Sequence, residues 1–112
     1  MTEHLTEEDA KLLTLARGAA ARIQADQGAA VRDETGRTYA SAGVTLGSRS
    51  FSALELAVAN AAAAGARGIE AAVVITQAGA IDTDIVSTLG GVGVPIYLCT
   101  PSGALTAVLQ SS

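Results

Sequence analysis

The sequence has few of the residues on which zinc and nucleophile chemistry depend. Its 112 residues include one cysteine and one histidine, Cys99 and His4. A catalytic zinc ion takes three protein ligands and a water molecule, and a structural zinc ion takes four. A zinc site made from the cysteines and histidines of one chain is therefore excluded by number. Sites with oxygen ligands for harder cations are not excluded by this count.

Aromatic residues are also scarce, and the basic residues form no cluster. Phe51, Tyr39 and Tyr97 are 3% of the chain, too few to stack successive bases. Seven Lys and Arg are scattered among eleven Asp and Glu, which gives a formal net charge of −4. We therefore expect no binding to nucleic acid, because no basic stripe is present to neutralise phosphates.

Long apolar runs and paired cysteines are absent as well. No run approaches the length of a membrane span, and the N-terminal MTEHLTEEDA is acidic where a secretory signal would be basic and then apolar. Cys99 lies in the apolar run VPIYLCT and has no partner for an intramolecular disulfide. We expect a cytoplasmic protein without membrane contact, with Cys99 buried as a small hydrophobic residue and His4 solvated.

Small hydrophobic residues are what the chain has in abundance. The hydrophobic fraction is 49%, and alanine and valine are prominent in it. This composition predicts one globular domain over residues 1–112, with a core of closely packed small side chains.

The first half of the chain predicts a helix, a hairpin and a second helix. Thr6 precedes EEDAKLLTLARGAAARI, which has acids in its first turn and apolar residues at helical spacing. Two strands follow in GAAVRDETGRTYASAGVTL, joined at Gly36, and Arg49 lies in the loop after them. The stretch SALELAVANAAAAG, residues 52–65, predicts the second helix.

The second half predicts three strands and a short helix. AAVVITQ and VPIYLCT are apolar runs of the length of buried parallel strands. Between them, Asp82 is expected to cap the helix IVSTL, and ALTAVLQ is the last strand. The fold class is therefore α/β, with a mixed five-stranded sheet covered by about three helices.

Three patterns resemble functional motifs, and each has a structural interpretation. Residues 90–93, GGVG, follow a helix and precede a strand, the reverse of a phosphate-binding loop, which favours a helix stop. Asp82 and Asp84 are a candidate carboxylate pair, but Asp82 occupies a cap position. Ser52 and Glu55 form the S-x-x-E pattern of a capping box. The serines have no histidine base in the core.

The helix over residues 52–65 has apolar residues on two faces. One row contains Leu54, Val58 and Ala61, and the other contains Leu56, Ala59 and Ala63. Such a helix requires two partner surfaces. We expect one to be the sheet and the other a neighbouring subunit.

The layout resembles the cytidine deaminase family of the small homotetrameric type. The resemblance rests on GAAVRDETGRTYASAGV, SALELAVANAAAAG and VPIYLCTPSGAL. It implies a three-layer cytidine deaminase-like sandwich, and a homo-oligomer that is a tetramer or a dimer.

The resemblance also implies where the family's chemistry would lie. A C-A-E motif and a P-C-x-x-C motif hold zinc in that family, and the Glu moves protons. Ser52 occupies the first ligand position, Leu54 the position of the Glu, and Gly79 and Asp82 the two cysteine positions. The family's Asn-x-Glu-Asn element, which holds ribose, corresponds to residues 43–46, GVTL, with Thr45 in place of its Glu.

These substitutions lead to a hypothesis and two alternatives. The hypothesis is a noncatalytic, oligomeric structural or regulatory protein with no catalytic residues, no metal and no cofactor. The first alternative is a binding module for a small molecule such as a nucleoside or base, in a cleft near Thr45, Ser52 and Glu55. The second is an active deaminase or hydrolase with an unconventional site, in which Glu55 acts with Asp82 or Asp84.

Overall fold

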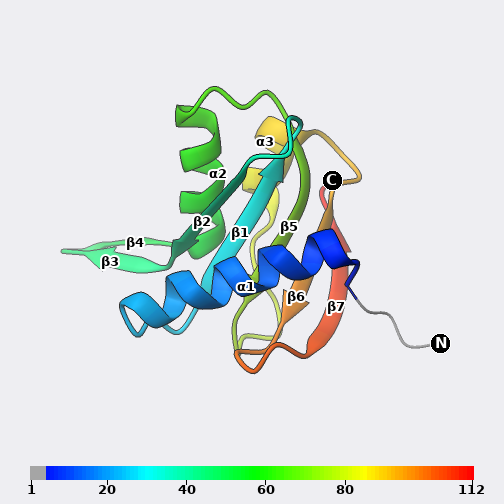
Figure 1. Cartoon of the computed structure of the whole chain (residues 1–112). Coiled ribbons are helices and arrows are strands. Elements are labelled where there is room, and N and C mark those ends of the chain that lie inside the picture. Colours follow the sequence, from blue (N-terminus) through cyan, green and yellow to red (C-terminus); the bar gives the residue numbers. More distant parts are fainter. Residues whose placement is uncertain (1–4) are drawn as a thin grey trace.

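A computed structural model describes residues 5–112 of the chain, so His4 lies outside the described residues (Figure 1). The elements in chain order are α1 (Glu7–Arg22), β1 (Gly28–Asp33), β2 (Thr38–Ala42), β3 (Val44–Leu46), β4 (Arg49–Phe51), α2 (Ala53–Ala63), β5 (Ile69–Ile75), α3 (Asp84–Gly90), β6 (Pro95–Cys99) and β7 (Leu105–Gln110).

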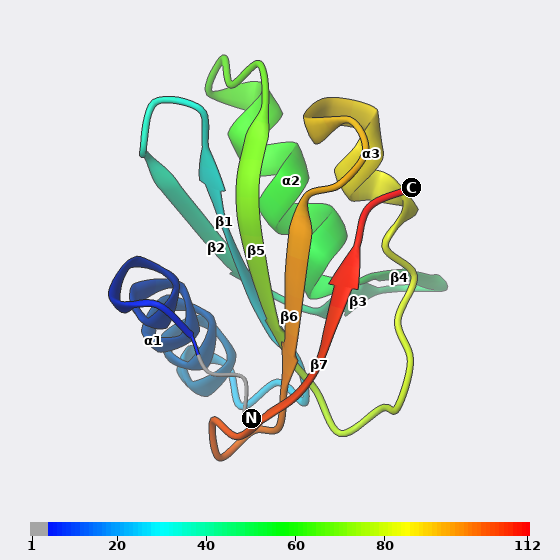
Figure 2. The ribbon, with the colours of Figure 1, turned by 90° about the vertical axis from the view of Figure 1, so that its right-hand side faces the viewer.

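A mixed five-stranded sheet forms the middle layer, as the sequence predicts. Its strand order is β2-β1-β5-β6-β7, and only β5 and β6 are parallel neighbours. Strand β1 is antiparallel to both β2 and β5, and β6 is antiparallel to β7. Helix α1 covers one face and helices α2 and α3 cover the other (Figures 1 and 2). The predicted α/β class with three helices is therefore confirmed.

Helix α1 packs on the sheet through small residues. Thr6 caps it as predicted, since its Oγ1 accepts from the amide of Asp9 at 3.1 Å. Leu12 and Ala16 are fully buried against the sheet. A Cβ on Gly28 would lie 2.2 Å from the carbonyl oxygen of Ala16, so only glycine permits this close approach of helix and strand.

The turn between β1 and β2 is organised by a buried carboxylate. Asp33 is 3% exposed and accepts from the hydroxyl and amide of Thr35, the amide of Arg37 and the hydroxyl of Tyr39. Burial alone raises the pKa of Asp33, but these hydrogen bonds outweigh it and hold that pKa below its usual value. Gly36 has φ of +89°, which explains its place in the turn.

Two local predictions were wrong. Arg49 does not lie in a loop, because it begins β4, which pairs with β3 in a second short hairpin. This two-stranded ribbon projects from the body of the molecule (Figure 1). The N-cap of α3 is Thr83 and not Asp82. Asp82 lies one residue earlier, where its Oδ1 still accepts from the amide of Asp84 at 2.9 Å.

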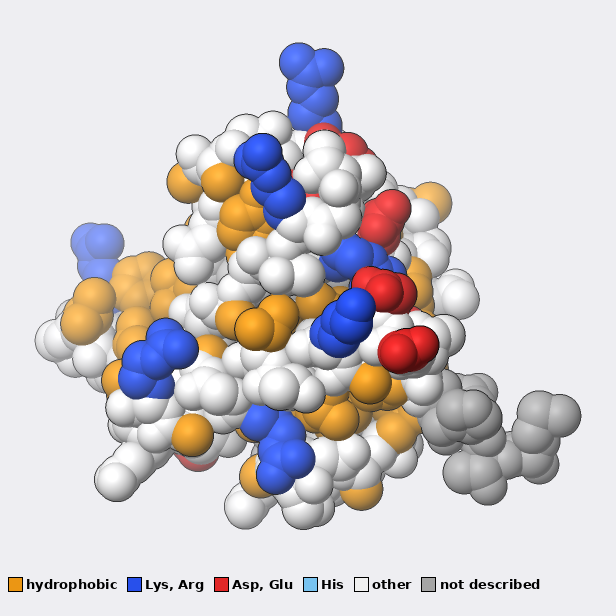
Figure 3. All heavy atoms as spheres, viewed as in Figure 1, with side chains coloured by type: hydrophobic (Ala, Val, Ile, Leu, Met, Phe, Trp, Pro, Cys, Tyr) orange, Lys and Arg blue, Asp and Glu red, His pale blue; other side chains and the backbone are white. Residues whose placement is uncertain are grey.

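The surface on the α1 side carries acidic and basic side chains interspersed with apolar ones (Figure 3). Within residues 5–112, no helix has the length and apolar character needed to cross a membrane.

Candidate functional site

The first turn of α2 is closed by the predicted capping box. Ser52 Oγ accepts from the amide of Glu55 at 3.0 Å, and Glu55 Oε1 accepts from the amide of Ser52 at 2.8 Å. Both side chains therefore stabilise the start of the helix.

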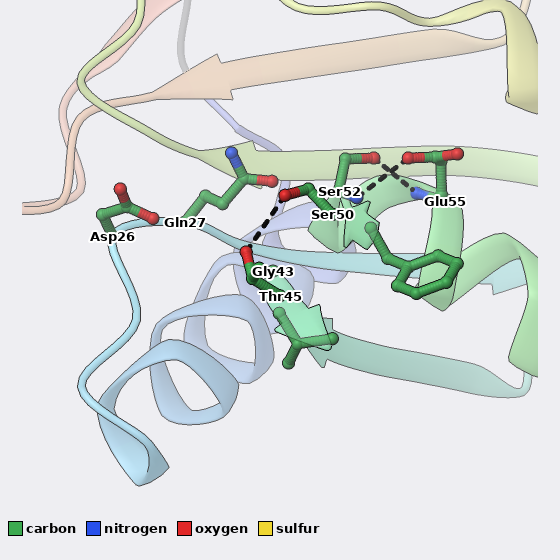
Figure 4. A pocket seen from close by; sticks show the side chains of 9 residues that line it. Asp26, Gln27, Gly43, Thr45, Ser50, Ser52 and Glu55 are labelled. Atoms are coloured by element: carbon green, nitrogen blue, oxygen red, sulfur yellow. Dashed lines mark hydrogen bonds between the residues drawn. The ribbon is translucent and has the colours of Figure 1, made fainter. Parts of the chain in front are cut away.

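An open cavity of about 400 Å³ lies beside this turn. Thr45, Ser52 and Glu55, the three binding residues expected from the sequence, all line it (Figure 4). The hydroxyls of Thr45 and Ser50 are hydrogen-bonded to each other at 3.1 Å across the β3–β4 ribbon. The other lining residues are Asp26, Gln27, Gly43, Val44 and Phe51. The structure therefore brings the three candidates to one place, on a mostly polar surface.

A second, smaller cavity of about 170 Å³ shares Gln27 and Ser52 with the first. Leu54 and Asp82 line it, so the cavity brings together three of the four positions at which the resemblance leads us to expect the family's zinc-binding and proton-transferring residues. Gly79 is not among its lining residues. Leu54 is 2% exposed and belongs to the hydrophobic core under α2. The wall of the cavity at Leu54 is thus aliphatic.

Gln27 joins the two cavities, and the sequence analysis missed it. Its Oε1 accepts from the amide of Ala53 at 2.8 Å, and its backbone oxygen accepts from the amide of Gly43 at 3.2 Å. A Cβ on Gly43 would lie 2.8 Å from Gln27 Cγ, so the missing side chain at Gly43 makes room for Gln27. The only sequence signal was one amide residue directly before an apolar strand. A contact across 26 positions leaves no periodic pattern.

The residues in the second cavity do not fit a zinc ion. Ser52 offers a neutral hydroxyl already engaged in the capping box, Leu54 offers no donor, and Asp82 offers one carboxylate. Gly79, outside the cavity lining, has no side chain to add. Zinc requires three or four thiolate, imidazole or carboxylate ligands. In the described part of the chain, no three His, Cys, Asp or Glu side chains are grouped so as to hold a metal.

The remaining sequence candidates lie apart from one another. Glu55 lines the first cavity and Asp82 the second, while Asp84 lines neither. Helix α3 ends at Gly90, and Gly91 follows with φ of +75°, which agrees with the predicted helix stop. Cys99 is fully buried as predicted, and burial raises the pKa of its thiol.

The comparisons with known proteins agree with this architecture. The family model described as cytidine deaminase-like matches residues 5–103. The chain belongs to this family. A solved cytidine deaminase from Burkholderia pseudomallei superimposes with a TM-score of 0.77 at 21% identity, covering 95% of this chain and 93% of that one. The cytidine deaminase from Mycobacterium leprae gives 0.66 at 19% identity, covering 95% and 94%. No curated protein matches the sequence.

The similarity to these two enzymes extends over the fold of almost the whole chain. At 21% and 19% identity it describes architecture alone. The chemistry of this chain must therefore be argued from its own side chains at the two cavities.

Proposed function

We propose that this chain is a noncatalytic, cytoplasmic member of the cytidine deaminase-like family that acts as an oligomeric structural or regulatory protein. The observation that carries the proposal is Leu54, an aliphatic side chain that is 2% exposed, at the position to which the resemblance assigns the family's proton-transferring Glu. A leucine cannot exchange protons with a bound water or base. Glu55, one residue later, is already bonded to the amide of Ser52.

The outer face of α2 supports the oligomeric part of the proposal. Leu54, Val58 and Ala61 face the core, whereas Ala59 and Ala63 are exposed. Small side chains on an exposed helix face allow a neighbouring subunit to approach closely. We therefore place one subunit contact of a tetramer or dimer on this face.

Metal analysis combined with an assay tests the noncatalytic proposal most directly. We expect the purified protein to contain zinc well below one atom per chain and to release no ammonia from cytidine, because its side chains supply too few zinc ligands. A zinc-dependent cytidine deaminase purified and assayed in parallel is the control. Stoichiometric zinc together with turnover would overturn the proposal, and light scattering that shows a folded monomer would overturn the oligomeric part.

A second candidate function is a binding module for a nucleoside or base. It is favoured by the cavity of about 400 Å³ that Thr45, Ser52 and Glu55 line together. The paired hydroxyls of Thr45 and Ser50 have remaining hydrogen-bonding capacity for a polar ligand. The side chain of Phe51 offers an apolar wall beside them.

Thermal unfolding with a panel of nucleosides, nucleobases and nucleotides tests this candidate. A ligand at a hundredfold excess over its Kd stabilises the folded state by about 2.7 kcal/mol, which raises the Tm by several degrees. We expect Thr45→Val to abolish the rise, because it removes the hydroxyl that lines the cavity. Thr38→Val, at an exposed position of β2 outside the lining of the cavity, is the matched control and should retain it. A panel without any stabilising compound would contradict the binding function.

A further inference from the structure

The charged residues of this chain stop abruptly before its end. Residues 85–112 contain no Asp, Glu, Lys, Arg or His, although charged residues make up 16% of the whole sequence. These uncharged residues form most of α3 and all of β6 and β7. Depletion of charge is typical of the buried centre of a protein interface.

Strand β7 forms one edge of the sheet, and within residues 5–112 β6 is the one strand that pairs with it. Figure 2 looks onto this edge, and no helix crosses in front of β7. The edge is six residues long, LTAVLQ, and contains neither a charged residue nor a proline. Soluble proteins usually protect an open edge with such residues, because unpaired backbone groups are ready to accept another strand.

The ladder with β6 identifies which backbone groups of β7 point outward. The amide of Ser111 donates to Val94 at 3.0 Å, and its oxygen accepts from the amide of Gly93 at 2.8 Å, so Ser111 faces β6. Gln110 is paired with Pro95, which has no amide hydrogen. The direction alternates along a regular strand, and a register shift opposite Leu98 and Cys99 interrupts this alternation between Leu105 and Ala107. The outward amides of the regular part of β7 therefore belong to Val108 and Gln110.

Apolar side chains accompany this open edge. Val108 is 36% exposed in the middle of β7. Val92 is 79% exposed. It precedes Gly93, whose amide donates to the backbone oxygen of Ser111, the residue directly after β7. Apolar side chains therefore flank the unpaired backbone groups of β7, and residues 85–112 place no charged side chain beside them.

We propose that the β7 edge is a self-association surface, at which β7 pairs antiparallel with β7 of a second copy of this chain. A twofold register centred on Val108 sets the outward amide and carbonyl of Val108 opposite those of Val108 in the second copy, so that the two residues exchange both hydrogen bonds. The surface is separate from the outer face of α2. Self-association at β7 is proposed whether or not the chain is catalytic.

A second copy is the favoured occupant because of charge. Each copy carries a formal net charge of −4, so two copies repel wherever their acidic surfaces meet. Residues 85–112, which include the β7 edge, carry no charged side chain, so two copies can approach there without this repulsion. A twofold antiparallel pair also has matching backbone groups without any change in sequence, whereas a foreign strand must supply its own register.

Sedimentation velocity over a range of concentrations tests the proposal with Val108→Lys. Two lysines would face each other across the twofold axis, so we expect the dissociation constant of this contact to rise at least about a hundredfold. Leu46→Lys, at a site 66% exposed on the β3–β4 ribbon, is the matched control and should leave assembly unchanged. Ala59→Arg, on the outer face of α2, should weaken only the contact proposed for that face.

Hydrogen exchange on the unmodified chain gives an independent readout that does not rely on a variant. The amides of Val108 and Gln110 are expected to become protected as protein concentration rises, and Val108→Lys should abolish this change while circular dichroism stays the same. An unmodified chain that is monomeric at all concentrations would overturn the proposal, and would leave the edge to a strand of another protein. Equal assembly and equal protection in Val108→Lys would also overturn it.

Discussion

Replacing Leu54 by glutamate is expected to destabilise the protein by about 3–5 kcal/mol without producing deaminase activity. Leu54 is 2% exposed and packs in the core cluster that includes Ala57, Val58 and Val74. The substitution removes buried aliphatic surface and places a carboxylate among apolar side chains. Burial raises the pKa of such a carboxyl, so it would favour the neutral form. The other positions assigned to the zinc site would still supply too few ligands, since Asp82 alone offers a carboxylate there.

Urea unfolding and the deamination assay measure the two parts of this result. Leu54→Met is the matched control, because it conserves volume and should cost less than about 1.5 kcal/mol. Leu54→Gln separates charge from polarity, since it is nearly isosteric with glutamate and has no charge. A Leu54→Glu protein that is as stable as the unmodified chain, or that binds zinc and deaminates cytidine, would show that the second cavity still supports the family's chemistry.

The parts of the structure that could be predicted from sequence have strong local signals. Ser52 and Glu55 lie three residues apart before an apolar run, which is a local geometry that the helix itself determines. The apolar runs of β5 and β6 are long enough to identify buried strands. Thr45, Ser52 and Glu55 could be expected near one another only through the resemblance to a known family.

The parts that could not be predicted depend on contacts distant in sequence or on very short elements. Strands β3 and β4 have three residues each, too few to establish an alternation of polar and apolar residues. Gln27 reaches Ala53 across the fold, and no periodic pattern records such a contact. At α3, Thr83 and Asp82 are both good capping residues, and one position separates them.

The capping box connects the fold to the proposed loss of chemistry. In this chain the polar groups at the start of α2 bond to the helix itself, and Gln27 bonds to the amide of Ala53. The first turn of α2 is therefore satisfied by the protein's own side chains. A zinc ligand at Ser52 would have to give up its bond to the amide of Glu55. Structural stability and metal binding compete for the same side chain here.

The second large effect is expected at the ion pair that joins α1 to the sheet. Asp9 is 5% exposed, and its Oδ1 lies 3.0 Å from Arg32 Nη1 on β1. Arg32 Nε also bonds to Glu70 on β5 at 3.0 Å. Burial lowers the pKa of Arg32, but its contacts with Glu70 and Asp9 outweigh burial and raise it, so the guanidinium stays charged. Asp9→Ala would leave this buried cation with Glu70 alone, at a cost of about 3 kcal/mol.

Two further variants distinguish the Asp9–Arg32 ion pair from the neighbouring contact with Glu70 and from simple filling of space. Glu70→Ala should cost less than about 1 kcal/mol, since the Glu70 side chain is 49% exposed and its charge is screened by water. Combining Asp9→Leu with Arg32→Met should recover most of the stability lost in Asp9→Ala, because apolar side chains of similar volume then fill the same space. If the double variant is no more stable than Asp9→Ala, the contact between α1 and β1 depends on the charges themselves and not on filling that space.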